Sequence, residues 1–169
     1  MRNFLCLLAV FFSASWSAES SDLDVVVASS LPRAFWENLR ASEGHEAYAL
    51  SAWLNPYYLQ GDFNGDGQTD FAVLAQEKRT GKRGVLVVHI GANQQFVIGA
   101  GNSIGNGGDD FSWMDAWQIY PRGRVGQGAD LEAPPPVLMG DALLVIKTES
   151  ASGLVYWTGT EYQWYPQGD

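Results

Sequence analysis

Residues 61–75 read GDFNGDGQTDFAVLA, a loop of oxygen-bearing side chains that runs directly into an apolar segment. We call residues 62–70 the acidic loop. Glycines at positions 65 and 67 mark a tight turn, because glycine adopts backbone conformations that other residues avoid. Acidic or amide side chains occupy positions 1, 3, 5 and 9 of the loop: Asp62, Asn64, Asp66 and Asp70.

This spacing suits a hard cation such as Ca²⁺, which takes six to eight oxygen ligands. The five expected ligands are the side-chain oxygens of Asp62, Asn64 and Asp66, the backbone carbonyl of Gln68 and the carboxylate of Asp70. An EF-hand would need a bidentate Glu at position 12, where this chain has Val73, so that motif is excluded. The alternative is a hairpin turn rich in Asp, Asn and Gly that holds no metal.

The pattern D-x-N-x-D-G-x-x-D followed by an apolar strand resembles the calcium loops of FG-GAP and VCBS-type repeats, over residues 57–76. In those families the loop joins two strands of a sheet and the metal is usually structural. The resemblance therefore implies the same five ligands and a Ca²⁺ ion that stabilises a β-hairpin. The motif occurs once, whereas a repeat architecture needs at least about three units. We expect one domain, not a full propeller.

The N-terminus has the order of a secretory signal. Arg2 precedes an apolar run at residues 4–12 and small residues at 13–18, and a cut after Ser17 places small residues at −3 and −1. The apolar run is shorter than the roughly 20 residues of a transmembrane helix. We expect residues 1–17 to be a cleavable signal peptide and the mature protein to be periplasmic or secreted, with no transmembrane anchor.

Composition limits the partners of the remaining residues, 18–169, which we expect to form a single calcium-binding domain. Cys6 is the only cysteine, so the mature chain forms no internal disulfide. The full chain has 10 Lys and Arg residues against 19 Asp and Glu residues. This balance argues against nucleic acid, whose binding needs many cations, and against an anionic membrane surface.

Periodicity predicts helices first and strands afterwards. Apolar residues with helical spacing predict a helix over Leu31–Leu39, with Ser30 as N-cap, and a weaker helix over Glu46–Leu54. The expected strands are residues 57–60, 71–76, 84–90, 96–98, 143–148, 155–157 and 162–165. The expected fold is α+β and mainly β, with one or two N-terminal helices followed by a single antiparallel sheet domain.

A second cluster, GNSIGNGGDDFSWMDAW at residues 101–117, combines a glycine-rich run with acids and tryptophans. The acids are Asp109, Asp110 and Asp115, and the tryptophans are Trp113 and Trp117. Glycines permit close backbone approach to another group, and the acids could bind a ligand or catalyse a reaction. Alternatively, Asp109 or Asp110 caps the following segment and the tryptophans belong to the core.

Aromatic residues are dense in the C-terminal hairpin at residues 155–165, where strand alternation places them on both faces. One face would pack on the core. The other would either form a stacking surface for sugar rings or a partner, or simply stabilise the hairpin through cross-strand pairs.

Catalytic motifs are weak. The only histidines are His45 and His89, and His89 lies in an apolar strand where a structural role is the default. No nucleophile elbow or zinc motif is present. We expect an exported, non-enzymatic calcium-binding protein with a protein or glycan ligand. The alternatives are a carbohydrate- or peptidoglycan-binding module, an Asp-dependent glycoside hydrolase, and an inhibitor or immunity-type partner of another exported protein.

Overall fold

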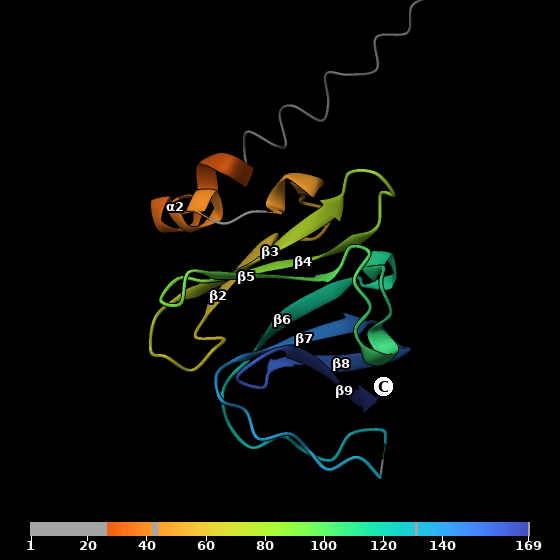
Figure 1. Cartoon of the computed structure of the whole chain (residues 1–169). Helices are drawn as coiled ribbons and strands as arrows, with labels where there is room; N and C mark the ends of the chain where they lie inside the picture. The colour runs from red at the N-terminus through yellow and green to blue at the C-terminus, as the bar shows by residue number, and fades with distance from the viewer. Residues whose placement is uncertain (1–26, 42–43, 131, 169) are drawn as a thin grey trace, which may run out of the picture.

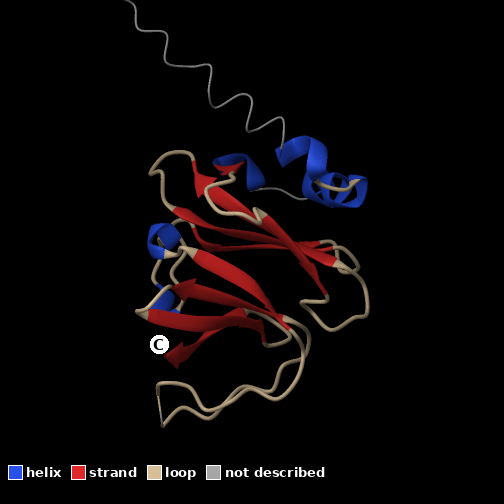
Figure 2. Ribbon diagram, turned by 180° about the vertical axis from the view of Figure 1, so that it is seen from behind, coloured by secondary structure: helices blue, strands red, loops and turns tan. Residues whose placement is uncertain are grey.

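Two antiparallel sheets packed face to face make up most of the protein (Figures 1 and 2). The computed structural model describes residues 27–41, 44–130 and 132–168, so the expected signal peptide at 1–17 lies outside the described residues. Helical segments cover the outer face of the first sheet, and a long connection crosses the outer face of the second. The expectation of a mainly β, non-propeller α+β fold is confirmed, except that there are two sheets instead of one.

The elements follow one another with short connections, apart from the segment before β7. The helical elements are the α-helical residues 27–30, α2 (Arg33–Ala41) and the 3₁₀ turns η1 (His45–Ala47), η2 (Gly105–Gly107) and η3 (Phe111–Trp113). The first sheet contains β1 (Tyr48–Leu50), β2 (Tyr58–Gly61), β3 (Asp70–Glu77), β4 (Arg83–His89) and β5 (Gln94–Gly99). The second contains β6 (Ala116–Tyr120), β7 (Ala142–Lys147), β8 (Ala151–Trp157) and β9 (Tyr162–Gly168).

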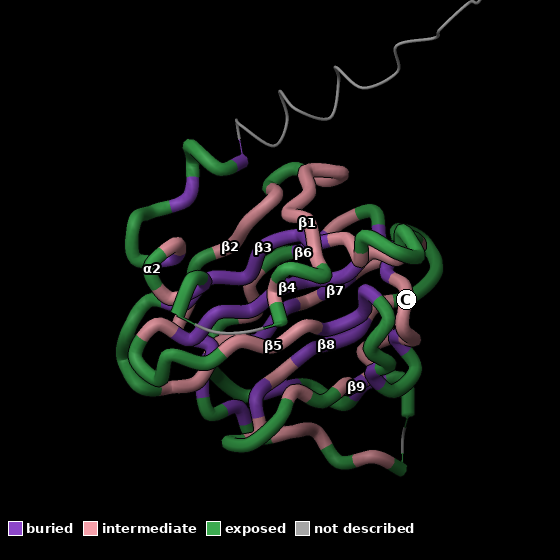
Figure 3. Tube along the Cα trace, turned by 45° about the horizontal axis from the view of Figure 1, so that its top comes forward, coloured by how far each residue is buried: buried purple, intermediate pink, exposed green. Residues whose placement is uncertain are grey.

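Strand β3 is the centre of the first sheet and is buried on both faces (Figure 3). It pairs with β4 along one edge, and with β1 and β2 one after the other along its second edge. Leu74 faces the second sheet, while the neighbouring Val73 faces the helical segments. Such burial explains the continuous apolar run FAVLA, because a strand covered on both faces does not alternate apolar and polar residues.

The core between the sheets draws side chains from both of them. It includes Phe63, Ala72, Leu74, Val85, Val87 and Ile98 from the first sheet and its loops, and Trp117, Leu143, Val145 and Val155 from the second. Phe111 and Met114, from the connection between the sheets, close one side. Burial at this scale contributes about 1.5–3 kcal/mol for each large apolar side chain, so this layer is the main source of stability.

The helix expected over Leu31–Leu39 is present, but it begins two residues later, immediately after Pro32. Its buried residues are Phe35 and Leu39, which pack on the outer face of the first sheet as the spacing predicted. No helix in the described part of the chain is long and apolar enough to cross a membrane.

The prediction of a helix over Glu46–Leu54 is wrong, because part of this segment pairs with β3 as a strand. After the short turn η1, Tyr48, Ala49 and Leu50 pair with the far end of β3. The amide of Ser51 then donates to the carbonyl of Leu74 over 2.8 Å. Hydrogen bonding to a distant strand outweighs the weak local helical pattern.

Strand β6 was not predicted, although its sequence AWQIY has the alternation of apolar and polar residues that is typical of a strand. Trp117 is buried and its neighbour Gln118 is exposed, which is the alternation of a half-buried strand.

The glycine-rich run at residues 101–108 packs closely against the side chain of Trp164 of β9. A Cβ atom on Gly107 would lie 2.8 Å from the indole ring, and one on Gly105 would lie 2.9 Å from the Trp164 Cβ. Opposite them, a Cβ on Gly153 of β8 would lie only 2.1 Å from the ring. The close approach that the glycines predicted is therefore to an internal tryptophan.

Gly153→Ala should lower the free energy of unfolding by about 1–3 kcal/mol, because overpacking forces Trp164 to move. Urea unfolding followed by tryptophan fluorescence measures the change. Gly126→Ala is the matched control, since nothing lies within 4 Å of a Cβ there. Equal midpoints for the two variants would contradict this account of the glycine-rich run.

Candidate functional site

The acidic loop connects β2 to β3, and the register of these strands fixes where it begins and ends. Gly61 pairs with Asp70 as the last residue pair, so residues 62–69 close the hairpin. Gly65 and Gly67 have φ values of 81° and 85°, the left-handed region that favours glycine. Phe63 turns into the core between the sheets and is fully buried, which anchors the loop to the sandwich.

The first three predicted ligands turn their oxygens toward the loop's own backbone. The two carboxylate oxygens of Asp62 accept from the amides of Gly65 and Gly67, over 2.8 and 3.0 Å. The side-chain oxygen of Asn64 accepts from the amide of Asp66 over 2.9 Å. An oxygen that accepts one hydrogen bond keeps a second lone pair, so these oxygens can bind a cation without giving up their hydrogen bonds.

Asp66 continues the pattern and lies at the exposed tip of the loop. One of its carboxylate oxygens accepts from the amide of Gln68 over 2.8 Å, and the other from the side-chain amide of Asn64 over 3.0 Å. A Cβ on Gly91 would lie 2.1 Å from the Gln68 side chain and 2.4 Å from Asp66. Both side chains therefore rest against the turn that follows β4.

Asp70, the fifth expected ligand, is fully buried at the start of β3. Its carboxylate accepts from the amides of Phe63, Asn64 and Ile90, over 3.0, 3.3 and 2.9 Å. The pKa of this carboxyl is raised to about 6, because burial and, to a smaller extent, the nearby Asp66 outweigh the backbone hydrogen bonds that lower it. Asp70 thus ties both ends of the loop to the end of β4.

The structure places all five predicted residues on one loop but does not bring their carboxylates into one tight group. Among the described residues, no three Asp, Glu, His or Cys side chains lie close enough to hold a metal ion by themselves. The donor set has the chemistry that a hard cation requires, with oxygen ligands on alternate residues of a glycine-bearing turn. In this conformation the carboxylates accept hydrogen bonds from backbone and side-chain amides.

A second contact, which the sequence did not reveal, fixes the acidic loop to the second sheet. Asp141, just before β7, donates its amide to the carbonyl of Asp62 over 2.7 Å and accepts the Asp62 amide over 3.1 Å. A Cβ on Gly140 would lie 2.2 Å from the same carbonyl, and one on Gly65 would lie 2.3 Å from the carbonyl of Met139. The two backbones touch directly. These partners are more than 70 residues apart in sequence, so no local pattern predicts the contact.

His89 lies beneath the acidic loop in a cluster with Phe96, Trp157 and Tyr162. Its Nε2 atom is 2.7 Å from the Tyr162 hydroxyl, and its Nδ1 atom is buried without a partner. Burial lowers the pKa of the imidazole to about 4, against the loop carboxylates, which raise it. A neutral, fully buried histidine agrees with the structural role expected from its strand.

Each of the three acids at residues 101–117 has a structural partner. Asp109 forms an ion pair with Lys82. Asp110 caps η3 by accepting the amide of Ser112 over 3.0 Å, as the capping alternative predicted. Asp115 accepts both the amide and the hydroxyl of Thr148, each over 2.8 Å, and also pairs with Lys147.

The aromatic residues of the last hairpin are mostly covered. Trp157 packs against His89 in the core between the sheets. On the outer face, Tyr165 is buried beneath the connection that leads from β6 to β7, and its hydroxyl accepts the amide of Gly128 over 2.9 Å. This burial favours the interpretation that the aromatics stabilise the hairpin.

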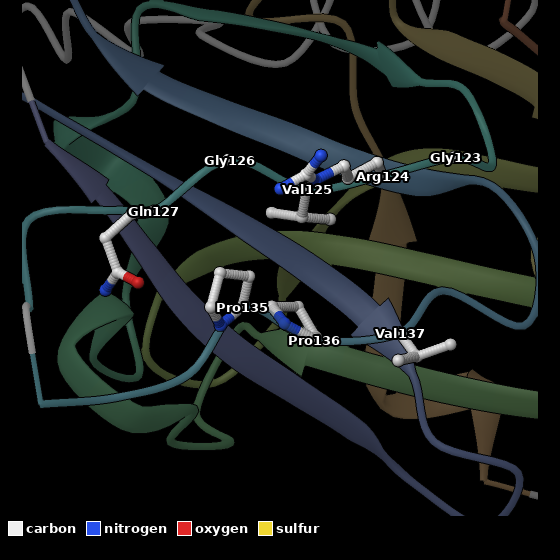
Figure 4. A pocket seen from close by; sticks show the side chains of 8 residues that line it. All are labelled: Gly123, Arg124, Val125, Gly126, Gln127, Pro135, Pro136 and Val137. Carbon is white, nitrogen blue, oxygen red and sulfur yellow. The ribbon is translucent and has the colours of Figure 1, made fainter.

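The connection between β6 and β7 runs out and back as two extended segments, bridged between Arg124 and Val137. Figure 4 shows the open pocket that lies between these segments, with a volume of about 690 Å³. Its lining residues are Gly123, Arg124, Val125, Gly126, Gln127, Pro135, Pro136 and Val137. Arg124 is the one charged side chain among these lining residues.

Comparisons with family models, curated proteins and solved structures found no match to this chain.

Removing the Asp115 carboxylate should destabilise the protein at neutral pH but not in acid. The backbone hydrogen bond from Thr148 is the largest influence that lowers the pKa of Asp115, to about 2. A depressed pKa contributes stability above the unfolded value of about 4, and this contribution is lost as pH falls toward 2. Urea midpoints of wild type and Asp115→Ala should therefore differ at pH 7 and converge between pH 4 and 2.

Asp115→Asn is the matched control, because it keeps an oxygen for Thr148 but does not titrate. A difference between wild type and Asp115→Ala that stays constant down to pH 2.5 would show that the carboxylate charge is not what stabilises this site.

Proposed function

We propose that this chain is an exported, non-enzymatic calcium-binding protein in which Ca²⁺ on the acidic loop stabilises the β2–β3 hairpin. The observation that carries the proposal is the orientation of Asp62, Asn64 and Asp66, whose side-chain oxygens accept hydrogen bonds from backbone amides within the loop. The same residues carry the resemblance to FG-GAP and VCBS-type loops. Export rests on the signal pattern at residues 1–17.

Charge supports a cation at this position. Three carboxylates lie within nine residues of chain, and Asp66 acts on Asp70 as a like charge. Like charges held close together destabilise each other unless a counter-charge is present. Asp62, Asn64, Asp66 and Asp70 would hold the ion together with the carbonyl of Gln68, and the ion would supply that counter-charge.

The position of the loop explains how a bound ion would stabilise more than a hairpin. Asp62 is hydrogen-bonded to Asp141 of the second sheet, and Asp70 to Ile90 after β4. A cation that holds Asp62 and Asp70 together would therefore also hold the two sheets at this end of the sandwich. Ligand bound only to the native state adds RT ln(1 + [L]/Kd) to its stability.

A non-enzymatic role is supported by the surroundings of the other titratable candidates. Each acid of residues 101–117 has a different partner. Asp109 pairs with Lys82, Asp110 accepts the amide of Ser112, and Asp115 accepts the amide of Thr148. His89 is buried away from solvent. Glycoside hydrolysis needs two carboxylates that face one bond, whereas each of these acids is held by a partner of its own.

Calcium should raise the melting temperature of the mature protein, and Asp66→Ala should abolish that rise. A site with a Kd of about 0.1 mM would gain about 2.7 kcal/mol in 10 mM Ca²⁺, which corresponds to roughly 5–10 °C. Thermal unfolding followed by circular dichroism in EDTA and in Ca²⁺ measures the shift.

Asp130→Ala is the matched control for Asp66→Ala. Asp130 also accepts backbone amides two and three residues ahead, but it lies in the β6–β7 connection. The Asp130→Ala substitution should leave the calcium-dependent rise in melting temperature intact. The same melting temperature for wild type in EDTA and in 10 mM Ca²⁺ would identify the acidic loop as an ordinary turn.

Asp141→Ala should behave differently from Asp66→Ala, because Asp141 holds the loop through hydrogen bonds rather than by binding the ion. Loss of the acceptor for the amides of Asp62 and Arg122 should cost about 1–3 kcal/mol even in EDTA. Urea unfolding in EDTA compares the two variants. If Asp141→Ala unfolds at the wild-type midpoint there, the contact between the loop and the second sheet contributes nothing.

A further inference from the structure

The outer face of the first sheet is only partly covered by helical segments. Helix α2 buries Phe35 and Leu39 against it, and the part nearer β1 is left as a groove. Two adjoining cavities of about 300 and 330 Å³ lie along this groove, and both are lined by Trp36, Tyr48 and Leu50. We call them together the helix–strand groove.

The floor of the groove is apolar and its aromatic walls are fixed in place. Leu39, Leu50 and Leu86 line the first cavity. The indole N–H of Trp36 donates to the carbonyl of Ala28 over 3.1 Å. On the opposite wall, the Tyr48 hydroxyl accepts from the side chain of Asn102 over 3.2 Å. A preformed apolar cavity with a few polar groups is the usual form of a small-molecule site, and each cavity is at the lower end of the size range, about 300–1,000 Å³.

The groove is lined by basic residues, although the chain as a whole is acidic. Arg40 and His45 line the first cavity, and Lys78 lines the second. Among the described residues, no Asp or Glu belongs to either lining, whereas acids outnumber Lys and Arg by 19 to 10 in the chain. The neighbouring acid, Glu46, accepts the amide of Gly44 over 3.1 Å and lies 4.0 Å from His45.

Lys78 and Arg40 differ in the contacts that they make. The Lys78 ammonium donates to the carbonyl of Glu46 over 2.7 Å, which ties the second cavity to η1. Arg40 is exposed in the last turn of α2 and makes no ion pair with any described residue. A guanidinium at the mouth of an apolar cavity is suited to carboxylate or sulfonate, which it can bind through two parallel hydrogen bonds.

We propose that the helix–strand groove binds a small amphipathic anion, with its apolar body against Trp36 and Leu50 and its anionic group on Arg40. The basic lining selects an anion, and the leucine and tryptophan surfaces select an apolar aryl or acyl body. This site is separate from the acidic loop and does not depend on the proposed calcium binding.

Fluorescence titration of the mature protein with 8-anilinonaphthalene-1-sulfonate tests the proposal. N-phenyl-1-naphthylamine, which has the same ring system without the sulfonate, is the matched probe for the apolar part. Wild type should bind both probes at one site. Arg40→Glu should weaken binding of the sulfonate about tenfold or more and change binding of the neutral probe less than about threefold, since a charge-assisted hydrogen bond is lost only with the anion.

Two further variants separate a local effect from a change in net charge. Arg40→Lys keeps the positive charge and should retain most of the sulfonate binding. Arg122→Glu makes the same charge change on an exposed arginine after β6, at the second sheet, and should leave both probes unaffected. Laurate should displace the sulfonate from wild type, as expected for an acyl anion that competes for the groove.

Three results would overturn the proposal. The first is equal sulfonate binding by wild type and Arg40→Glu, which would remove the anion specificity. The second is no binding of either probe to folded wild type. The third is a dimer on size-exclusion chromatography that Leu50→Arg dissociates, which would show that a second copy of the chain covers the groove. All three readouts can be obtained in EDTA, so they do not depend on the outcome of the calcium experiment.

Discussion

Burial of β3 on both faces is the constraint on which the rest of the structure depends. One face of the strand packs into the core between the sheets and the other lies under helical segments, so the layers on either side are held through it. Its first residue, Asp70, also fixes the acidic loop. Because apolar burial is the dominant favourable term in folding, disturbance of this strand would affect both cores and the loop together.

The acidic loop shows how hydrogen bonds and charge oppose each other at one site. Backbone amides satisfy the oxygens of Asp62 and Asp70, yet burial of Asp70 disfavours its charged form. Buried charges are tolerated when they are paired or bound to a metal. Hydrogen bonds to Asp141 and to Ile90 after β4 hold the loop, and under the proposed function a cation would add to that stability by neutralising charge.

Local patterns predicted elements well where the local preference and the tertiary contacts agree. The strands of the apolar run FAVLA and of GVLVVHI formed as expected, and so did the core-facing residues of α2. Prediction failed where a distant partner decided the outcome. Residues 48–50 form a strand because they pair with the edge of β3. Gly105 and Gly107 leave the space that the side chain of Trp164 of β9 occupies. Sequence spacing carries no information on contacts of this kind.

The sequence by itself determined that the chain is mainly β, that it carries one glycine-bearing loop with oxygen-bearing side chains on alternate residues, and which residues those are. These features depend on neighbouring residues, so local spacing is sufficient to predict them. Only the tertiary structure decided that there are two sheets, that Asp141 holds the acidic loop, and that Arg40 and Lys78 meet at one groove. Those contacts join residues far apart in the chain, and packing of whole layers brings them together.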